Sequence, residues 1–409
     1  MVTSRSALII GAGLSGHAMA FALATRGWSV QLIDDAGPAE SIGSWQPVLA
    51  QHPSVTPDDA PMSRLSRIAV ALSRGRYEVG VMRWSGRLQL CSPQTAQACL
   101  GHLPMSWAQV VDARQASSIA GIGLKSGGLW LPQVGSAAPR SLCSAWTVPG
   151  IELRRGISVA SVAKPSSHWQ ALASSGRILG EAPHLIVASG AGTPELRLID
   201  RDGIDTRLRA QFGLASWQRR TAWSTLARVG REHLPACILG GEGHAVASDD
   251  SQHLLLGPVS GPNDDQQAES HRTTLASWAR YQSSLIQAPA SPALSATMAG
   301  TRLSVRDHLP LAGQVPDRHE IERQYTALRR DARQPLPRLE GLWISTAFGG
   351  RGLLWSVLCA ELIASQLDGT SCPIEPRLAE SLDPGRFIKR DLPRVKQPVD
   401  ALGLGDDLT

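Results

Sequence analysis

Three glycines near the N-terminus have the spacing that a nucleotide-binding turn requires. Gly11, Gly13 and Gly16 form a G-x-G-x-x-G pattern directly after the apolar residues 7–10. In such a turn the first glycine lets the chain reverse tightly, and the second lets the backbone approach a pyrophosphate. The third glycine lets the following helix pack closely on the strand. The chemistry that this pattern predicts is the binding of a dinucleotide.

The elements around these glycines fit that prediction. Residues 7–10 read as a strand, residues 17–26 as a helix, and residues 30–33 as a second strand that ends at Asp34. A carboxylate at this place accepts hydrogen bonds from ribose hydroxyls, and the N–H groups at the helix start face the phosphates. A secretory signal peptide is the alternative, but it would need neither the glycine spacing nor Asp34. The predicted contacts are Gly11, Gly13, Leu14, Ser15, Gly16 and Asp34.

Two more glycine-rich turns follow apolar strands later in the chain. Residues 185–188 are fully apolar, as in a buried parallel strand, and lead into residues 189–192. The strand 342–345 leads through a second turn into the apolar helix 353–367. Both turns predict further backbone contacts with the cofactor, although a simple surface turn is the alternative at 189–192. The predicted contacts are Ala188, Gly190, Ala191, Gly349, Gly350, Arg351, Gly352 and Leu353.

The remaining pattern is a mixture of strands and helices. Expected strands include 77–82, 87–91, 128–132, 151–153, 157–162, 169–172 and 178–179, and expected helices include one opening at 63 and those at 93–100, 106–111 and 269–286. Such a mixture predicts an α/β fold with a strand-rich second part.

Composition excludes several classes of protein. The chain of 409 residues is 43% hydrophobic and 18% charged, as in a globular protein of two or three domains. Its six cysteines form no C-x-x-C pair, which argues against a disulfide framework or structural zinc and favours the reducing cytoplasm. No apolar run reaches the roughly 18 residues of a membrane span. We expect no metal and no membrane contact.

Several further segments carry a family resemblance. They are residues 52–53, 56–59, 63–64, 305–311, 315–317, 349–353 and 382–387. With the glycine turns, they resemble the glycine oxidase and D-amino-acid oxidase (DAO) superfamily of FAD enzymes. Within it, the chain is most similar to the flavin-dependent half of the bifunctional tRNA 5-methylaminomethyl-2-thiouridine biosynthesis proteins, from residue 7 to about residue 390. The segments 305–311 and 382–387 are the most specific.

The resemblance implies an α/β architecture with two domains and a tail. A discontinuous FAD-binding Rossmann-like domain of the GR2/DAO type is expected at 1–74, 151–204 and 296–372. An inserted α+β substrate domain, built on an antiparallel sheet, is expected at 75–150 and 205–295, and a basic tail at 373–409.

The same resemblance implies where the cofactor lies. The ADP end of FAD is expected at the N-terminal glycines and Asp34, with Val162 as a further contact. The flavin ring is expected near residues 44–52 and at the start of the helix after Gly352. A helix N-terminus stabilises an anion such as reduced flavin by about 0.3–2 kcal/mol.

The implied activity is oxidative removal of the carboxymethyl group from carboxymethylaminomethyl-(2-thio)uridine in the tRNA wobble position. The products are aminomethyl uridine and glyoxylate. Arg302 would bind the substrate carboxylate, and Arg351 would contact flavin or substrate, which makes these two the catalytic candidates. His52 and His308 are further substrate-binding candidates. The alternatives are an ion pair of Arg302 with Asp307 or a neighbouring carboxylate, a packing role for Arg351 and structural roles for both histidines.

The chain departs from the family at residues 41–46 and 209–211, and the methyltransferase half of the bifunctional proteins is missing. The departures leave room for a relative that acts on another amine. The resemblance implies tRNA as the substrate, and the missing half implies a separate methyltransferase that acts on the product. Basic clusters at 207–220, 329–333 and 386–396 are expected to contact tRNA phosphates, with a solvated surface as the alternative. A small-molecule amine or amino-acid oxidase for glycine, sarcosine or D-amino acids remains open. So does a flavin-binding subunit without catalysis.

Overall fold

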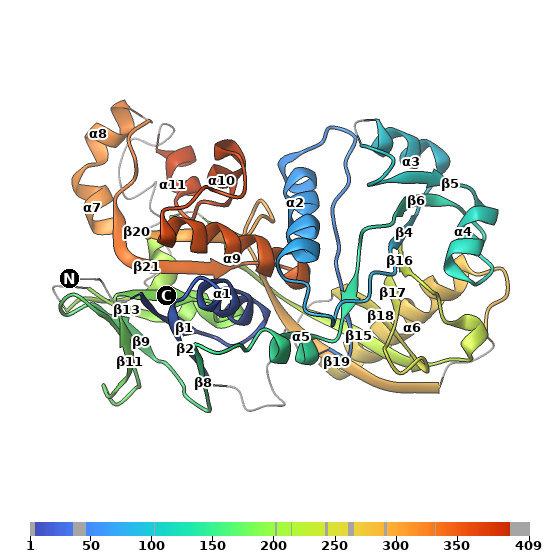
Figure 1. The fold of residues 1–409 in the computed structure, drawn as a ribbon, viewed down its shortest axis with the longest axis horizontal. Coiled ribbons are helices and arrows are strands. Elements are labelled where there is room, and N and C mark those ends of the chain that lie inside the picture. The colour runs from blue at the N-terminus through green and yellow to red at the C-terminus, as the bar shows by residue number, and fades with distance from the viewer. Residues whose placement is uncertain are drawn as a thin grey trace. The chain divides into compact units, whose positions relative to one another are not determined.

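The computed structural model describes residues 5–35, 46–101, 103–200, 203–213, 215–241, 244–260, 266–289, 293–331 and 333–392. The chain divides into two compact units, each built from separate stretches of sequence (Figure 1). The first unit contains residues 1–41, 146–219 and 303–409, and the second contains residues 42–145 and 220–302. Residues 42–74, which were expected in the cofactor domain, group with the second unit, and residues 205–219 group with the first.

The first unit is organised around a six-stranded sheet in the order β20-β21-β12-β1-β2-β8. Its strands are β1 (Ser6–Ile10), β2 (Ser29–Asp34), β8 (Ile151–Arg155), β12 (His184–Val187), β20 (Leu311–Pro316) and β21 (Arg338–Thr346). All pairs are parallel except β20 with β21. The carboxyl ends of β1, β12 and β21 therefore meet at one edge of the sheet.

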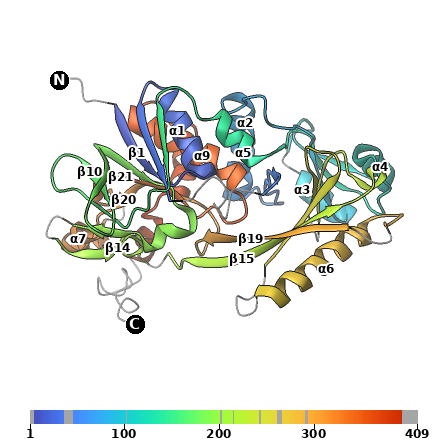
Figure 2. The same cartoon turned by 90° about the horizontal axis from the view of Figure 1, so that it is seen from below.

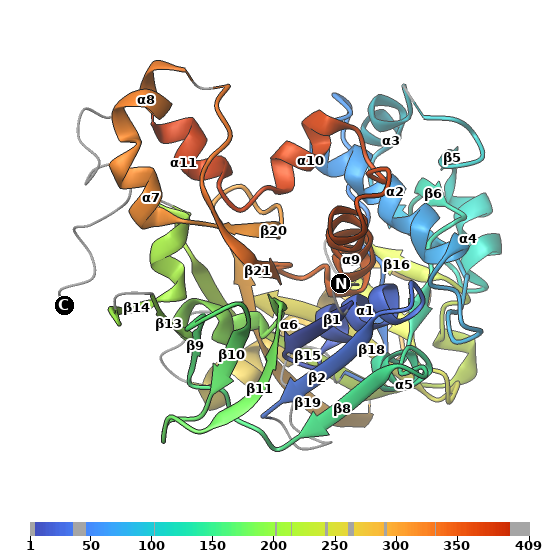
Figure 3. The same ribbon diagram turned by 60° about the vertical axis from the view of Figure 1, so that its left-hand side comes forward.

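Both faces of this sheet are covered. Helices α1 (Leu14–Ala24) and α9 (Gly352–Asp368) pack against each other and against strands of the sheet (Figure 3). On the other face, Leu8 and Ile10 of β1 join one buried cluster with Val162, which belongs to a second, five-stranded sheet. Alternate residues of a strand point to opposite faces, so β1 is apolar throughout because it is buried on both sides.

The other elements of the first unit surround this core. The second sheet has the order β11-β10-β9-β13-β14, with β9 (Ser161–Ala163), β10 (Trp169–Leu172), β11 (Ile178–Ala182), β13 (Arg197–Ile199) and β14 (Asp205–Arg207). The short helices are η1 (Gly190–Glu195), η2 (Leu208–Phe212), α7 (Arg318–Arg323), α8 (Tyr325–Arg330), α10 (Pro376–Leu382) and α11 (Arg386–Asp391).

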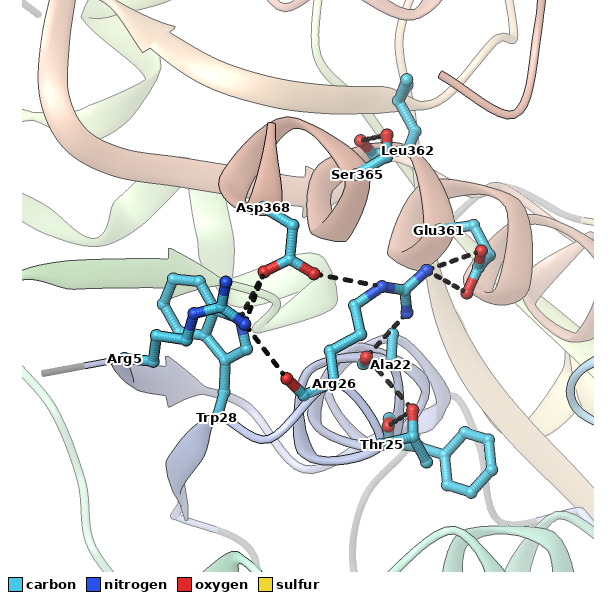
Figure 4. Close-up of polar contacts among 10 residues, drawn as sticks. Arg5, Ala22, Thr25, Arg26, Trp28, Glu361, Leu362, Ser365 and Asp368 are labelled. Carbon is cyan, nitrogen blue, oxygen red and sulfur yellow. Dashed lines mark hydrogen bonds and ion pairs between the residues drawn. The ribbon is translucent and has the colours of Figure 1, made fainter. Parts of the chain in front are cut away.

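A partly buried arginine joins α1 to α9. Arg26, just after α1, donates from Nη2 to both oxygens of Glu361 at 3.1 and 2.9 Å (Figure 4). Its Nε lies 3.4 Å from Asp368, which also accepts a hydrogen bond from Trp28. The side chain of Glu361 is only 3% exposed, so Arg26 neutralises a carboxylate that water does not reach. This cluster sets how the two helices lie together.

We expect the Arg26→Met substitution to lower the free energy of unfolding by about 1–3 kcal/mol, because it removes the guanidinium group that donates to the buried Glu361 carboxylate. Urea titration followed by circular dichroism measures the change. The matched control is Arg197→Met, since Arg197 is 60% exposed in its pair with Asp205 and exposed pairs contribute about 0–1 kcal/mol. Equal losses in the two variants would contradict this account of the cluster.

The second unit is built on an eight-stranded sheet in the order β19-β15-β18-β17-β16-β4-β6-β5. These strands are β4 (Arg87–Leu90), β5 (Gln109–Val111), β6 (Gly128–Leu131), β15 (Gln218–Arg228), β16 (Ile238–Gly240), β17 (His244–Ala247), β18 (His253–Ser260) and β19 (Ala293–Ser304). The registers of β15–β18, β17–β18, β16–β17, β4–β6 and β5–β6 are antiparallel, and that of β16–β4 is parallel.

Helices cover this sheet. Helix α6 (Gln266–Ser284) lies along one face, where Trp278 and Tyr281 pack on Leu239 and Leu254 (Figure 2). The remaining elements are β3 (Leu49–Ala50), β7 (Ser136–Ala137), η3 (Arg231–His233), α2 (Pro61–Gly75), α3 (Pro93–Leu100), α4 (Ala113–Ala120) and α5 (Pro139–Ala145). No helix among the described residues is both long and apolar enough to cross a membrane.

Two predicted elements are wrong. Residues 77–82 form no strand. The chain turns at Gly80, which has φ 74° and donates its N–H to the side chain of Glu78, and the side chain of Tyr77 is buried. Residues 106–111 form no helix, and their last part is strand β5. The helix starts later, where Asp112 caps α4 through the N–H of Gln115.

The predicted tail is folded in its described part. Residues 376–391 carry α10 and α11, and Ile388 and Leu392 are buried with residues of α7 and α8. The apolar residues Ile388 and Leu392 therefore anchor this Pro-rich segment to α7 and α8. Residues 393–409, including Arg394 and Lys396 of the expected basic cluster, lie outside the described residues.

Candidate functional site

The three glycine turns predicted from the sequence lie at one edge of the six-stranded sheet. Ser15 at the start of α1 donates from its hydroxyl to the backbone oxygen of Ser345, at 2.8 Å. Thr346 donates to the backbone oxygen of Gly190, at 3.3 Å. The N–H of Ala188 donates to Ile10, at 2.8 Å. The turns after β1, β12 and β21 are thus joined by direct hydrogen bonds.

The glycines of the first turn are sterically required. Gly11 has φ 102°, and a Cβ there would lie 2.6 Å from the backbone oxygen of Ala188. A Cβ on Gly16 would lie 1.8 Å from the backbone oxygen of Gly11. Gly11 therefore allows the tight turn and Gly16 allows the close packing of helix on strand, as the spacing predicts.

Asp34 lies at the end of β2, beside the same turn. Its carboxylate accepts a hydrogen bond from the N–H of Ala12, and the residue is 8% exposed. His17 is buried on α1, and burial lowers the pKa of its ring, so the imidazole is neutral at pH 7. The turn thus provides backbone N–H groups and one carboxylate, and the buried histidine beside it carries no positive charge.

Arg351 occupies the start of α9. It is the N-cap residue of the helix, and burial lowers the pKa of its guanidinium. Gly349, at φ 55°, donates its N–H to the backbone oxygen of Leu303 at 2.8 Å. Leu303 directly follows Arg302 in the chain. Val162, by contrast, lies in β9 with a fully buried side chain.

The second unit contains a cluster that joins two predicted candidates, His52 and Arg302, to two residues that the sequence did not reveal, Arg87 and His244. Arg87, only 8% exposed, donates from Nη1 to Nδ1 of His52 at 2.7 Å and from Nη2 to the side chain of Gln89 at 2.8 Å. Arginine has no acceptor, so Nδ1 of His52 must accept. His52 is therefore neutral, with its proton on Nε2. The only sign of this contact in the sequence is the i, i+2 spacing of Arg87 and Gln89, which places both side chains on the same face of a strand.

His244 and Arg302 belong to the same cluster. The rings of His52 and His244 meet edge to face with centroids 4.4 Å apart. Burial of the ring lowers the pKa of His244 to about 3, and the charges of Arg87 and Arg302 add to the effect. The charges of two arginines thus act on one buried imidazole, His244.

The pKa of His244 predicts a pH dependence of stability. The ordinary pKa is 6.5 and the folded value is about 3, so between these pH values the unfolded chain binds a proton that the folded protein does not. The free energy of unfolding must therefore fall as the pH is lowered through this window. The His244→Gln variant should lose less stability than the parent between pH 6.5 and 4 in parallel urea titrations. Parallel pH curves for the two proteins would contradict the assignment.

The segment 305–311 has a structural role that the sequence did not predict. Arg386 of α11 donates to both oxygens of Asp307, at 2.9 Å each, and to the backbone oxygens of Leu309 and Pro310. The ion pair of Asp307 is thus made with Arg386, and the pair with Arg302 that the sequence left open is not the one formed. His308 is exposed in the turn, at φ 59°.

The basic clusters differ in how much positive charge they leave. Arg207, Arg209 and Arg219 lie 2.7, 3.8 and 3.8 Å from one carboxylate, Glu195. Three guanidinium groups facing one carboxylate leave a net positive surface. Arg386 is only 10% exposed in its pair with Asp307, so its expected contact with phosphates is replaced by a structural role. No group of three or more metal-ligating side chains occurs among the described residues.

The family model for FAD dependent oxidoreductases (DAO) matches residues 6–366, most of the chain. The chain belongs to the DAO family of FAD-dependent oxidoreductases. It is therefore a flavoenzyme that uses FAD, and the resemblance predicted from its glycine turns is confirmed. The mixed α/β class is also confirmed.

Two curated relatives of similar sequence carry the same name. The tRNA 5-methylaminomethyl-2-thiouridine biosynthesis bifunctional protein MnmC of Cupriavidus necator is 32% identical over 95% of this chain and 61% of that protein. The protein of the same name from Burkholderia multivorans is 33% identical over 96% of this chain and 61% of its own length. The flavoenzyme thus spans about three fifths of these relatives.

Solved structures share its fold. Glycine oxidase from Geobacillus kaustophilus matches 93% of this chain and 99% of its own, with a TM-score of 0.68 and 17% identity. L-proline dehydrogenase from P. horikoshii matches 95% and 98%, with a TM-score of 0.70 and 16% identity. At these identities the likeness establishes the fold.

The first unit of the flavoenzyme fits FAD. Helices α1 and α9 begin at Gly13 and Arg351, neither of which makes a side-chain cap, and neither helix has an acid in its first turn. Such N-termini attract anions, as the pyrophosphate and the reduced flavin require. The roles of the individual glycines, Asp34, Val162 and Leu353 in holding FAD stay predictions. Residues 36–45, where part of the flavin contact was expected, lie outside the described residues.

Proposed function

We propose that the flavoenzyme removes the carboxymethyl group from carboxymethylaminomethyl-(2-thio)uridine in the wobble position of tRNA. The C–N bond of an N-substituted glycine is oxidised, water adds to the resulting carbon–nitrogen double bond, and glyoxylate leaves. Aminomethyl uridine remains in the RNA. Bound FAD supplies the two-electron oxidation. The observation that carries the proposal is the pair of arginines, Arg87 and Arg302, whose charges act together on His244 in one cluster.

A carboxylate is the group that this cluster would receive. The guanidinium fork binds a carboxylate through two parallel hydrogen bonds, which fixes its orientation as well as its position. Arg302 of β19 would hold the substrate in this way, with Arg87 of β4 adding positive charge. A glycine-like substrate held at its carboxylate has its reacting CH–NH group one carbon away, so the arginines determine which bond is presented.

The two histidines keep the amine of the substrate reactive. A protonated amine has no lone pair to support oxidation of its neighbouring C–H bond, so the amine must be neutral. His52 carries its proton on Nε2 because Nδ1 accepts from Arg87, and His244 stays uncharged because its pKa is about 3. Neutral imidazoles can donate to or accept from a neutral amine without placing another positive charge beside it.

The start of α9 would serve the flavin. Arg351 and the uncapped N-terminus of α9 provide positive charge for the electron-rich end of the cofactor. The hydrogen bond from Gly349 to Leu303 ties this turn to the residue after Arg302. His308 stays a candidate for substrate contact.

tRNA is the proposed macromolecular substrate. The relatives at 32% identity are named for biosynthesis of a modified tRNA uridine, and the arginines around Glu195 provide an excess of positive charge for phosphates. A separate methyltransferase that acts on the aminomethyl product is the proposed partner, and the cytoplasm is the proposed location.

Mass spectrometry of tRNA nucleosides tests the proposal. The purified flavoenzyme is incubated with tRNA that carries carboxymethylaminomethyl-2-thiouridine, and the nucleosides are then analysed. We expect the modified uridine to lose its carboxymethyl group and glyoxylate to appear in equal amount. Binding of tRNA should weaken as salt is raised.

Free amines provide the comparison. Glycine, sarcosine and D-amino acids are offered to the same preparation without RNA. Rapid turnover of one of them, with unchanged tRNA, would replace the proposal by a small-molecule oxidase. Unchanged tRNA and no turnover of any amine by a fully flavinated protein would indicate a flavin-binding subunit.

A further inference from the structure

The second unit contains a cavity of about 710 Å³ between its sheet and helix α6. Its walls come from the end of β4, the starts of α3 and α4, residues 125–127, residues 239–241, the start of β17 and α6. Known small-molecule sites have volumes of about 300–1,000 Å³, so this cavity is large enough for a nucleotide-sized ligand. The function proposed above uses one of its lining residues, His244, and leaves the rest of the cavity unassigned.

The cavity lies mainly on the face of the sheet opposite the arginine cluster. Gly240 pairs with His244, and a Cβ on Gly240 would meet the guanidinium of Arg87 at 2.2 Å, so this pair faces the cluster. Leu239 and Ala245 are the next pair and point the other way, into the core beneath α6. The cavity floor belongs to this second face and reaches His244 only at the end of the strands.

The floor is apolar but contains an unsatisfied hydroxyl. Leu239, Ala245 and Tyr281 line it, and all three are buried. Ser277 of α6 also lines the cavity, is only 4% exposed, and its Oγ has no hydrogen-bond partner among the described residues. A buried hydroxyl without a partner is costly in a finished core, which points to a ligand that supplies the partner.

The rim carries positive charge. Lys125 and Arg280 are both exposed and line the cavity. The acid at the rim, Asp112, is occupied in capping α4 through the N–H of Gln115. The N–H of Lys125 donates to the backbone oxygen of Ser284 at 3.0 Å, so the loop that carries this lysine is tied to α6. The two cations are thus held above the same apolar floor.

We propose that this cavity binds a nucleoside monophosphate. The base lies on the apolar floor, with one edge hydrogen-bonded to Ser277, and the phosphate lies between Lys125 and Arg280. A planar ring with polar edges satisfies both the apolar floor and its single hydroxyl, which an aliphatic chain would not. The phosphate satisfies the two cations. The ligand is either a free nucleotide or a nucleotide of the RNA substrate.

Calorimetry on the FAD-saturated flavoenzyme tests this site. UMP and AMP are titrated separately into the protein. Uridine and inorganic phosphate, the two parts of UMP, are each titrated in the same way. We expect one nucleotide per chain, bound at least about tenfold more tightly than either half. The charge reversals Lys125→Glu and Arg280→Glu should each weaken binding at least about tenfold. Both residues are exposed, so folding is retained.

The control is Arg228→Ala, which removes another exposed arginine of the second unit and should leave nucleotide affinity unchanged. Absence of nucleotide binding would overturn the proposal, as would equal binding by the charge-reversed variants. Tighter binding of octanoate than of UMP would overturn the choice of ligand. Competition by a short oligoribonucleotide would identify RNA as the source, and its absence a free nucleotide. The readout needs no turnover, so it stands apart from the proposed tRNA reaction.

Discussion

The Arg302→Ala variant is expected to lower kcat/KM on carboxymethylaminomethyl-uridine tRNA by about 100- to 1,000-fold. The reason is that truncating one partner of a desolvated charge pair costs about 2–5 kcal/mol. Arg302 acts electrostatically on His244 together with Arg87, so its loss removes one of two charges that would face the substrate carboxylate. Steady-state kinetics with glyoxylate as the measured product gives the change.

Two further variants separate a specific role of Arg302 from a general effect of charge. Arg302→Lys keeps the charge but loses the planar fork, so we expect it to recover only part of the activity. Arg228→Ala removes an exposed arginine from the same unit and should have wild-type kinetics. All three variants should retain the flavin absorbance of the parent. Full activity of Arg302→Ala would remove Arg302 from the site.

A substrate analogue sharpens the test. For a tRNA whose modified uridine carries an ethylaminomethyl group instead, the carboxylate is missing. Arg302→Ala should then cost little, because the variant and the analogue remove two halves of the same interaction. A loss as large as with the natural substrate would mean that Arg302 acts through folding of the site.

The cofactor edge of the fold was predictable because its determinants are local. The spacing of Gly11, Gly13 and Gly16 encodes a backbone geometry within six residues, and the structure shows why Gly11 and Gly16 can be nothing larger. Apolar runs before each glycine turn indicated parallel strands, whose carboxyl ends must share an edge. Local pattern and sheet topology together therefore predicted where the three turns meet.

The substrate cluster was not predictable in the same way. His52, Arg87, His244 and Arg302 are separated by up to 250 residues in the sequence. Pairing of β16 with β4 and β17 brings Arg87 and His244 together, whereas His52 follows β3 and Arg302 lies on β19. Arg87 appears in the sequence as one arginine among many. The same limit explains Arg386, which the sequence suggested for phosphate contact but whose partner, Asp307, lies 79 residues away.

Gly16→Ala should give a protein that is isolated almost without flavin. The added Cβ would lie 1.8 Å from the backbone oxygen of Gly11, a distance that no real Cβ contact shows. The strand and α1 must then separate, which moves the helix N-terminus and the N–H groups that would bind the pyrophosphate. Overpacking costs about 1–3 kcal/mol, and more where backbone must move, so we expect FAD affinity to fall at least about 100-fold.

Flavin absorbance per chain, followed by titration of the stripped protein with FAD, measures the loss. Gly75→Ala is the matched control: Gly75 ends α2, nothing lies within 4 Å of its added Cβ, and flavin content should stay unchanged. Urea unfolding of both stripped variants shows whether the chain still folds. A folded Gly16→Ala protein with full flavin affinity would mean that the pyrophosphate lies elsewhere, because the backbone shift that the methyl group forces is centred on this turn.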